Sequence, residues 1–226
     1  MIEVLPAILP YSFKELEENL ELLKGVSEYI QIDVTDGKFA GKASWPLAKP
    51  DNNFEEIVRQ ERGLPFWEDF EFEIDLMVSN PFPLAKDFIF AGASRIIFHA
   101  DTIKLEDDKL ILDQLKSEGL VEIGIAVRSN TDPELIKELL EFADFFQVMT
   151  CNPIGFQGSS FDEKSLEKIK LIRSWLPNMS ISCDGSMNPE TVELVMNAGA
   201  TRIVSGSFVL NSVNPIEAIE ELKGLV

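Results

Sequence analysis

Short apolar runs alternate with amphipathic segments along the whole chain. Eight of the runs are rich in branched and aromatic residues, which predicts strands. They cover residues 3–9, 29–34, 72–78, 94–100, 121–127, 145–150, 179–184 and 201–206. Between them lie segments whose apolar residues recur at three- and four-residue spacing, as in helices, and these include 12–24, 132–143, 162–176 and 188–199. The pattern therefore predicts a strand–helix unit that is repeated eight times.

The predicted strands are nearly continuously apolar, which is typical of parallel strands covered by helices on both faces. Such units form either an open, doubly wound sheet or a closed (β/α)8 barrel. The segments AGASRII (91–97) and AGATRIV (198–204) match closely and lead into the fourth and the eighth strand. Two similar junctions half a chain apart favour two four-unit halves that close on themselves. We therefore predict an α/β fold, a single (β/α)8 TIM barrel over residues 1–226, with a long loop or lid region at about 37–69, after the second strand.

The composition narrows the class of protein. The chain has 226 residues, of which 45% are hydrophobic, and this is enough for one large core. No apolar run approaches the roughly 18 residues of a membrane-spanning helix. The formal charge of −19 disfavours binding to nucleic acid or to anionic membranes. Cys151 and Cys183 have no metal-motif spacing and are typical of reduced thiols, so we expect a cytoplasmic protein.

Carboxylates stand at the ends of three predicted strands. Gln31 and Asp33 share one face of the second strand, because alternate residues of a strand point the same way, and Asp75 and Met77 share one face of the third. Asp184 ends the seventh strand. In a barrel of this kind the active site lies at the carboxyl ends of the strands. Three converging carboxylates are costly to bury unless they are paired, protonated or metal-bound, so they predict a functional cluster.

The last three strands end in turns that are rich in glycine and serine, at 152–161, 184–186 and 205–207. Glycine lets backbone N–H groups approach an anion. Barrel enzymes often bind phosphate in the loops that follow strands seven and eight. The three turns together therefore predict a phosphate site.

Five segments carry a resemblance to a known family. QIDVTDGKF (31–39) is similar to a His-x-Asp-x-Met-Asp-Gly-x-Phe motif, with glutamine in place of the histidine. The other segments are PAIL (6–9), DLMVSNP (75–81), VMTCNPIGFQGSSF (148–161) and CDGSMNPE (183–190). In order and spacing they resemble the ribulose-phosphate 3-epimerases along nearly the full chain. The resemblance implies a barrel of the ribulose-phosphate-binding type, and an isomerase of pentose-phosphate carbohydrate metabolism.

The resemblance also implies roles for individual residues. In this family two carboxylates exchange the C3 proton of a ketopentose 5-phosphate through an enediolate, and Asp33 and Asp184 match them. Both acids and two histidines hold a divalent metal, and the histidine positions are Gln31 and Asp75 in this chain. The positions that match the family's substrate-binding residues are Met77, Met149, Gly155, Gly158, Gly185, Ser186, Gly206 and Ser207.

The replacement of both histidines leaves three hypotheses open. A metal set of Gln31, Asp33, Asp75 and Asp184 has only oxygen donors, which favours Mg²⁺ or Mn²⁺ over the Zn²⁺ or Fe²⁺ that the family uses. An enzyme without metal would instead keep one of the crowded carboxylates protonated. The third hypothesis is a sugar-phosphate-binding barrel that has lost catalysis or changed its specificity. A phosphorylated ketose is the expected partner in each case, and the resemblance is compatible with a homo-oligomer.

Overall fold

The computed structural model describes residues 2–225 of the chain. Eight parallel strands close into a barrel in the order β1-β10-β9-β6-β5-β4-β3-β2, and β1 pairs with both β10 and β2 to complete the ring. The strands are β1 (Glu3–Ile8), β2 (Tyr29–Thr35), β3 (Glu71–Met77), β4 (Arg95–His99), β5 (Glu122–Val127), β6 (Phe145–Met149), β9 (Ser180–Asp184) and β10 (Arg202–Ser205). Each one falls on a predicted strand, and the predicted (β/α)8 barrel is confirmed.

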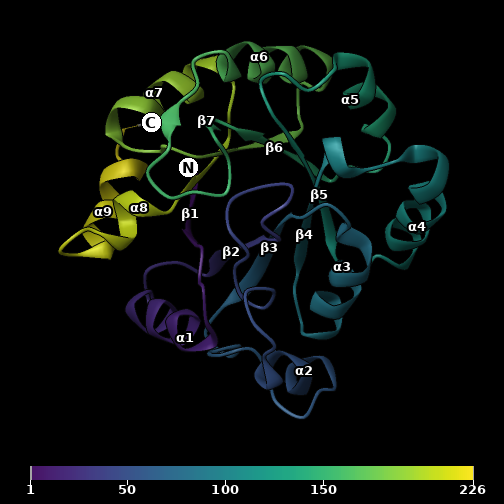
Figure 1. Ribbon diagram of the computed structural model, residues 1–226. Helices are drawn as coiled ribbons and strands as arrows, with labels where there is room; N and C mark the ends of the chain where they lie inside the picture. Colours follow the sequence, from purple (N-terminus) through teal and green to yellow (C-terminus); the bar gives the residue numbers. More distant parts are fainter. Residues whose placement is uncertain (1, 226) are drawn as a thin grey trace.

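Helices surround the strands as an outer ring (Figure 1). They are α1 (Phe13–Leu22), α2 (Asn52–Val58), α3 (Pro81–Phe90), α4 (Leu105–Glu118), α5 (Pro133–Leu139), α6 (Ser165–Trp175), α7 (Pro189–Ala198), α8 (Ser207–Leu210) and α9 (Pro215–Lys223), with a 3-10 turn η1 (Ala100–Thr102) after β4. A short antiparallel pair, β7 (Cys151–Asn152) and β8 (Ser160–Phe161), lies within the connection that follows β6. Within residues 2–225, no helix has the length and apolarity that a membrane span requires.

Local capping explains where several helices begin and end. The hydroxyl of Ser12 accepts a hydrogen bond from the backbone N–H of Glu15, 3.2 Å away, and so starts α1. Asn188 forms a full capping box at the start of α7, with a proline at the first helical position. Gly119 ends α4 in the left-handed conformation, which a glycine adopts without steric cost. These signals fix the lengths of the helices, and therefore the places where the strands begin.

The connection at 37–69 divides into two parts. Trp45 is buried among aromatic rings of the outer core, including Phe54 and Phe88, and its indole N–H donates to Asp51 at 2.9 Å. The chain after Trp45 runs outward into α2, which lies between α1 and α3 on the outside of the barrel (Figure 1). Only residues 37–44 remain beside the barrel mouth. The lid that we predicted for 37–69 is therefore limited, as a candidate, to this first part.

The interior of the barrel differs from the space outside the strands. Between strands and helices the core is apolar and continuous, and Cys183 lies in it. Inside the barrel, buried polar side chains form two levels. Glu73 and Arg202 pair near the amino ends of the strands, and the carboxylates of the predicted site lie nearer the carboxyl ends. Buried charges of this kind need partners, so the contacts of each carboxylate decide what the site can do.

Candidate active site

Three strands bring the predicted carboxylates together. Asp33 of β2 pairs in register with Asp75 of β3, and Asp184 is the last residue of β9, in register with Met149 of β6. One oxygen of each of the three carboxylates lies within 4.8 Å of the others. This separation suits ligands of a single metal ion. The arrangement follows from strand periodicity, because each acid is an inward-facing residue at the same level of the barrel.

Two buried amides lie between the acids. The Nε2 of Gln31 donates to Asp33 Oδ1 at 2.8 Å and to Asp184 Oδ2 at 3.2 Å. The Nε2 of Gln147, on β6, donates to Asp75 Oδ2 at 2.9 Å and to Asp184 Oδ2 at 3.4 Å. Gln147 was missed in the sequence, although it stands two residues before Met149 and so shares its face. The two amides connect all three carboxylates into one network.

His99 contacts the network at Asp75. Its Nε2 lies 3.0 Å from Asp75 Oδ1, and both side chains are fully buried. The imidazole and the ring of Phe39 pack edge to face, with the ring centroids 5.1 Å apart. Asp75 is therefore held through one oxygen by His99 and through the other by Gln147. Asp33 and Asp184 form no ion pair with a lysine or arginine in the described part of the chain.

Burial and mutual repulsion set the proton affinity of the acids. Burial is the main cause that raises the pKa of Asp184 to about 8, and the nearby carboxylate of Asp75 adds to it. Burial also raises the pKa of Asp33 well above its usual value, with further contributions from Asp184 and Asp75. Hydrogen bonds from Gln31 oppose the rise at both acids. Without a cation, the cluster therefore retains protons at neutral pH.

This predicts how stability depends on pH. The pKa of Asp184 is higher in the folded state than in the unfolded state. Its contribution to the stability of the native state is therefore fully present below about pH 4, and it is lost as the pH rises toward about 8. For protein kept in a chelator, we expect the free energy of unfolding to fall over this window, by up to about 1.4 kcal/mol per pH unit from Asp184. Urea denaturation across the window measures it. In the Asp184→Asn variant the slope should be smaller, and an identical slope would contradict the assignment.

One small cavity contains all the predicted catalytic and substrate-binding positions. It has a volume of about 50 Å³ and opens between the carboxyl ends of the strands. Its lining includes Asp33, Met77, Met149, Gly155, Gly158, Asp184, Gly185, Ser186, Gly206 and Ser207. The roles of these residues remain predictions, but they share one space.

The turn after β9 is tied to the loop after β6. Gly185 has a φ of +108°, and a Cβ atom there would overlap the thiol of Cys151, so only glycine fits. Ser186 also has a positive φ, +58°, and its hydroxyl donates to the carbonyl oxygen of Ser159. The hydroxyl of Thr150 donates to the carbonyl oxygen of Gly185 at 2.6 Å. These contacts hold two of the predicted phosphate turns in a fixed relation.

The loop at 37–44 lies across the mouth and meets the loop after β6. A Cβ atom at Gly41, whose φ is +54°, would overlap the carbonyl oxygen of Gly155. On the other side of the loop, the hydroxyl of Thr35 donates to the carbonyl oxygen of Lys42. Two loops that follow different strands of the barrel are therefore in backbone contact beside Gly155, which lines the cavity.

The Gly41→Ala variant tests this contact. Gly119 offers a matched control, because its φ is +60° and nothing lies within 4 Å of its missing Cβ. The left-handed conformation alone costs alanine about 1–2 kcal/mol, and we expect this loss for Gly119→Ala. Gly41→Ala should lose about 1–3 kcal/mol more, from the forced separation of the loops. Urea denaturation measures both, and equal losses would mean that the loops do not need this contact.

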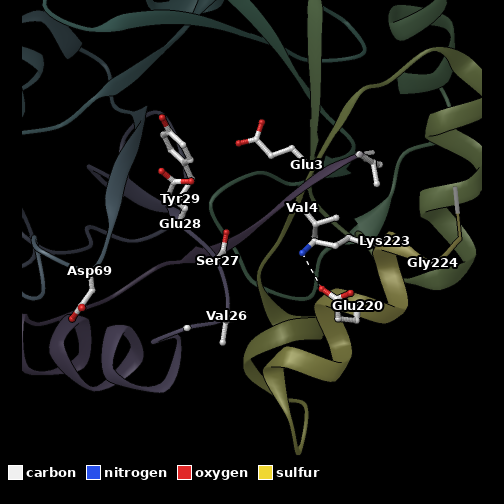
Figure 2. Close-up of a pocket in the computed structure, with 12 residues that line it drawn as sticks. Glu3, Val4, Val26, Ser27, Glu28, Tyr29, Asp69, Glu220, Lys223 and Gly224 are labelled. Atoms are coloured by element: carbon white, nitrogen blue, oxygen red, sulfur yellow. Dashed lines mark hydrogen bonds and ion pairs between the residues drawn. The ribbon is translucent and has the colours of Figure 1, made fainter.

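A wider depression opens at the opposite end of the barrel. It has a volume of about 1050 Å³ and lies where β1 and β2 begin. Figure 2 shows carboxylates of Glu3, Glu28 and Asp69 around it, with Lys223 paired to Glu220. These carboxylates are dispersed along the rim and do not converge as those of the cavity do. Because (β/α)8 barrels carry their chemistry at the carboxyl ends of the strands, we assign no site to this depression.

Comparisons with known proteins identify the family of the chain. A sequence profile described as the ribulose-phosphate 3 epimerase family matches residues 3–210. The ribulose-phosphate 3-epimerase of Candida glabrata is 31% identical over 97% of this chain and 90% of its own. The enzyme of the same name from Bacillus subtilis is 31% identical over 99% of both chains.

Solved structures agree on the fold. A structure of KGPDC from Streptococcus mutans has a TM-score of 0.72 and 14% identity over 99% of this chain and 96% of its own. The 3-hexulose-6-phosphate synthase of Salmonella typhimurium has a TM-score of 0.69 and 14% identity over 99% and 98%. At these identities the likeness shows only a shared barrel. The sequence matches also identify the family, and this chain belongs to the ribulose-phosphate 3-epimerase family.

Proposed function

We propose that the protein is an isomerase that inverts C3 of a ketopentose 5-phosphate, with Asp33 and Asp184 as its two acid–base groups. One observation carries the proposal most strongly. Two carboxylates from β2 and β9 border the same cavity, and burial raises the pKa of each. General acid–base catalysis works best when the pKa of the group lies near the working pH. Neither acid is neutralised by a lysine or arginine of the described chain, so both remain free to exchange protons.

The reaction is a proton exchange on two faces of one carbon. One aspartate takes the proton from C3, and the electron pair of the C3–H bond moves into the enediolate formed with the neighbouring C2 carbonyl. The other aspartate, in its protonated form, returns a proton to the opposite face. Because Gln31 donates to both carboxylates, it holds them in a fixed relation and favours their ionised forms, which opposes the effect of burial.

The donor set fits a divalent ion that prefers oxygen ligands. Three carboxylates converge, and the buried Oε1 of Gln31 has no hydrogen-bond partner, so a rotation of the amide would offer it as a further ligand. Asp33, Asp75, Asp184 and Gln31 would hold the ion, and Mg²⁺ or Mn²⁺ suits them better than Zn²⁺ or Fe²⁺. When bound, the ion would supply positive charge beside the oxygens that become negative in the enediolate.

The glycine- and serine-rich turns would hold the phosphate. Gly185, Ser186, Gly206 and Ser207 all border the cavity. Backbone N–H groups of such turns make a concave anion site, and the fixed relation of the turns reduces the entropy lost on binding. Met77 and Met149 would contact the sugar carbons.

A solvent-exchange experiment tests the proposal. The protein is incubated with D-ribulose 5-phosphate in D₂O, first in a chelator and then with Mg²⁺, Mn²⁺, Zn²⁺ or Fe²⁺ added singly. We expect deuterium to appear at C3, which NMR detects. The loss of both histidines favours a second candidate, a sugar-phosphate-binding barrel without catalysis. Measurable binding of the sugar phosphate without exchange under any condition would select that candidate.

A further inference from the structure

Gln147 has a place in the cluster that no motif assigns to it. It is fully buried on β6, and its amide nitrogen lies 2.9 Å from Asp75 Oδ2 and 3.4 Å from Asp184 Oδ2. Its amide oxygen has no hydrogen-bond partner. Gln31 repeats this arrangement across the cluster, with its nitrogen between Asp33 and Asp184 and its own oxygen unpartnered. Two buried amides thus face three carboxylates, and each leaves one polar atom unsatisfied.

An unsatisfied buried oxygen has a cost. Leaving a buried acceptor without a partner costs about 1–3 kcal/mol, so each of the two oxygens favours a partner that the described contacts do not supply. Rotating an amide by about 180° exchanges its oxygen and nitrogen with little movement of other atoms. In the present orientation the nitrogens of Gln31 and Gln147 face the carboxyl oxygens and donate hydrogen bonds to them. With a cation among the acids, both oxygens would become satisfied ligands.

The separations match a hard-metal site. Mg²⁺ binds six oxygens at about 2.1 Å in an octahedron, so neighbouring ligand atoms lie about 3.0 Å apart. The atoms of Gln31 and Gln147 that face the carboxylates lie between 2.8 Å and 3.4 Å from them. Asp184 Oδ2 is the neighbour that both amides share. The two amide heads are therefore close enough to the carboxylate oxygens to share one ion with them after rotation.

We propose that Gln147 is a metal ligand, and that its amide oxygen, together with that of Gln31, completes an all-oxygen site for Mg²⁺ or Mn²⁺ with the three aspartates. The inference rests on the metal-dependent form of the proposed function. It also explains why the chain tolerates glutamine, a polar residue, inside an otherwise apolar strand: FFQVM has no other polar side chain. His99 then acts behind the site, by orienting Asp75.

Mn²⁺ binding tests the inference without relying on activity. Electron paramagnetic resonance gives the affinity for Mn²⁺, and water proton relaxation gives the number of waters bound to the ion. In Gln147→Leu, we expect at least a roughly 10-fold loss of affinity and one additional bound water, because water fills the position that the amide oxygen leaves. Gln147→Glu, which keeps an oxygen but cannot donate a hydrogen bond, should retain the water count of the wild type. Gln114→Leu, on the exposed face of α4, is the control and should change neither value.

Three results would overturn the inference. These are unchanged affinity in a folded Gln147→Leu protein, weaker affinity with an unchanged number of waters, and no binding of Mn²⁺ to the wild type at millimolar concentration. The second result would mean that Gln147 only positions Asp75 and Asp184. Deuterium exchange on the same samples separates this test from the proposed function. Deuterium exchange at C3 without Mn²⁺ binding would contradict only the assignment of Gln147 as a metal ligand. Mn²⁺ binding with the expected number of waters, but without deuterium exchange, would contradict only the proposed function.

Discussion

Asparagine at Asp33 or at Asp184 is expected to lower the rate of epimerisation by roughly 10³-fold, because each position supplies one of the two proton transfers. Asparagine keeps the size and one oxygen of the side chain, so the hydrogen bonds from Gln31 have an acceptor in both variants. What is lost is the ability to take or give a proton. The rate is measured with each of the two C3 epimers as the starting substrate.

The two variants should fail in different ways. A carboxylate that lies on one face of C3 can still remove the proton from the epimer that presents it there, and return deuterium to the same face. Asp33→Asn should therefore retain slow solvent exchange with one epimer, and Asp184→Asn with the other. A merely structural role for either acid would lower both exchanges together, so this asymmetry identifies two catalytic bases.

A carboxylate outside the cluster, at the same end of the barrel, gives a control. Asp101 follows β4 and pairs with Arg128, with 2.8 Å between Oδ2 and Nε, outside the cavity lining. Asp101→Asn should change the rate by less than about 3-fold, because an exposed ion pair contributes little. If Asp33→Asn or Asp184→Asn behaved like this control, the two-base assignment would be wrong.

Local sequence pattern was enough to place the acids. Strand periodicity put Gln31 and Asp33 on one face, and the end of the seventh predicted strand supplied Asp184. The contacts of Asp75 could not be obtained in this way. They depend on the register of β3 against β4 and on the position of β6 across the barrel, which bring His99 and Gln147 to opposite oxygens of one carboxylate. Such contacts join residues far apart in the sequence, and no local pattern encodes them.

The connection at 37–69 shows a similar limit. Its length and its prolines indicated a loop, and loops of that length often cover sites. The burial of Trp45 against Phe54 and Phe88 depends on how α2 and α3 pack, which the sequence pattern did not reveal. The contact of Gly41 with Gly155 is also non-local, because glycine in a loop indicates a turn but not which backbone approaches it.

Breaking the ion pair of Glu73 and Arg202, near the amino ends of the strands, is expected to have the largest effect on stability. Glu73 of β3 is fully buried, and its Oε2 lies 2.5 Å from Nη2 of Arg202 on β10 and 3.5 Å from Nη1 of Arg95 on β4. These contacts span the barrel, and they neutralise a carboxylate that water cannot reach. Removing Arg202 leaves Glu73 with only the longer contact to Arg95, and breaking a buried ion pair typically costs about 3–5 kcal/mol.

Arg202→Met is therefore expected to lower the free energy of unfolding by about 3–5 kcal/mol at pH 7, as measured by urea denaturation. Burial already raises the pKa of Glu73, and Arg202 is the main group that opposes the rise, so the variant should raise this pKa further. When the pKa of a carboxyl is higher in the folded protein than in the unfolded chain, the protein becomes less stable as the pH rises. The deficit of the variant should accordingly be smaller near pH 4, where Glu73 is protonated, than at pH 7.

A double variant separates the charge from the packing. The double variant Glu73→Gln, Arg202→Met has no buried carboxylate at this level of the barrel. Replacing a whole buried ion pair by uncharged groups often changes the stability of a protein very little. We expect this double variant to recover most of the loss at pH 7 and to show no additional dependence on pH. The guanidinium of Arg202 also lies over the ring of Phe145, 4.7 Å from the ring centroid. If the double variant were as unstable as Arg202→Met alone, the contribution of Arg202 would come from this packing and not from its charge.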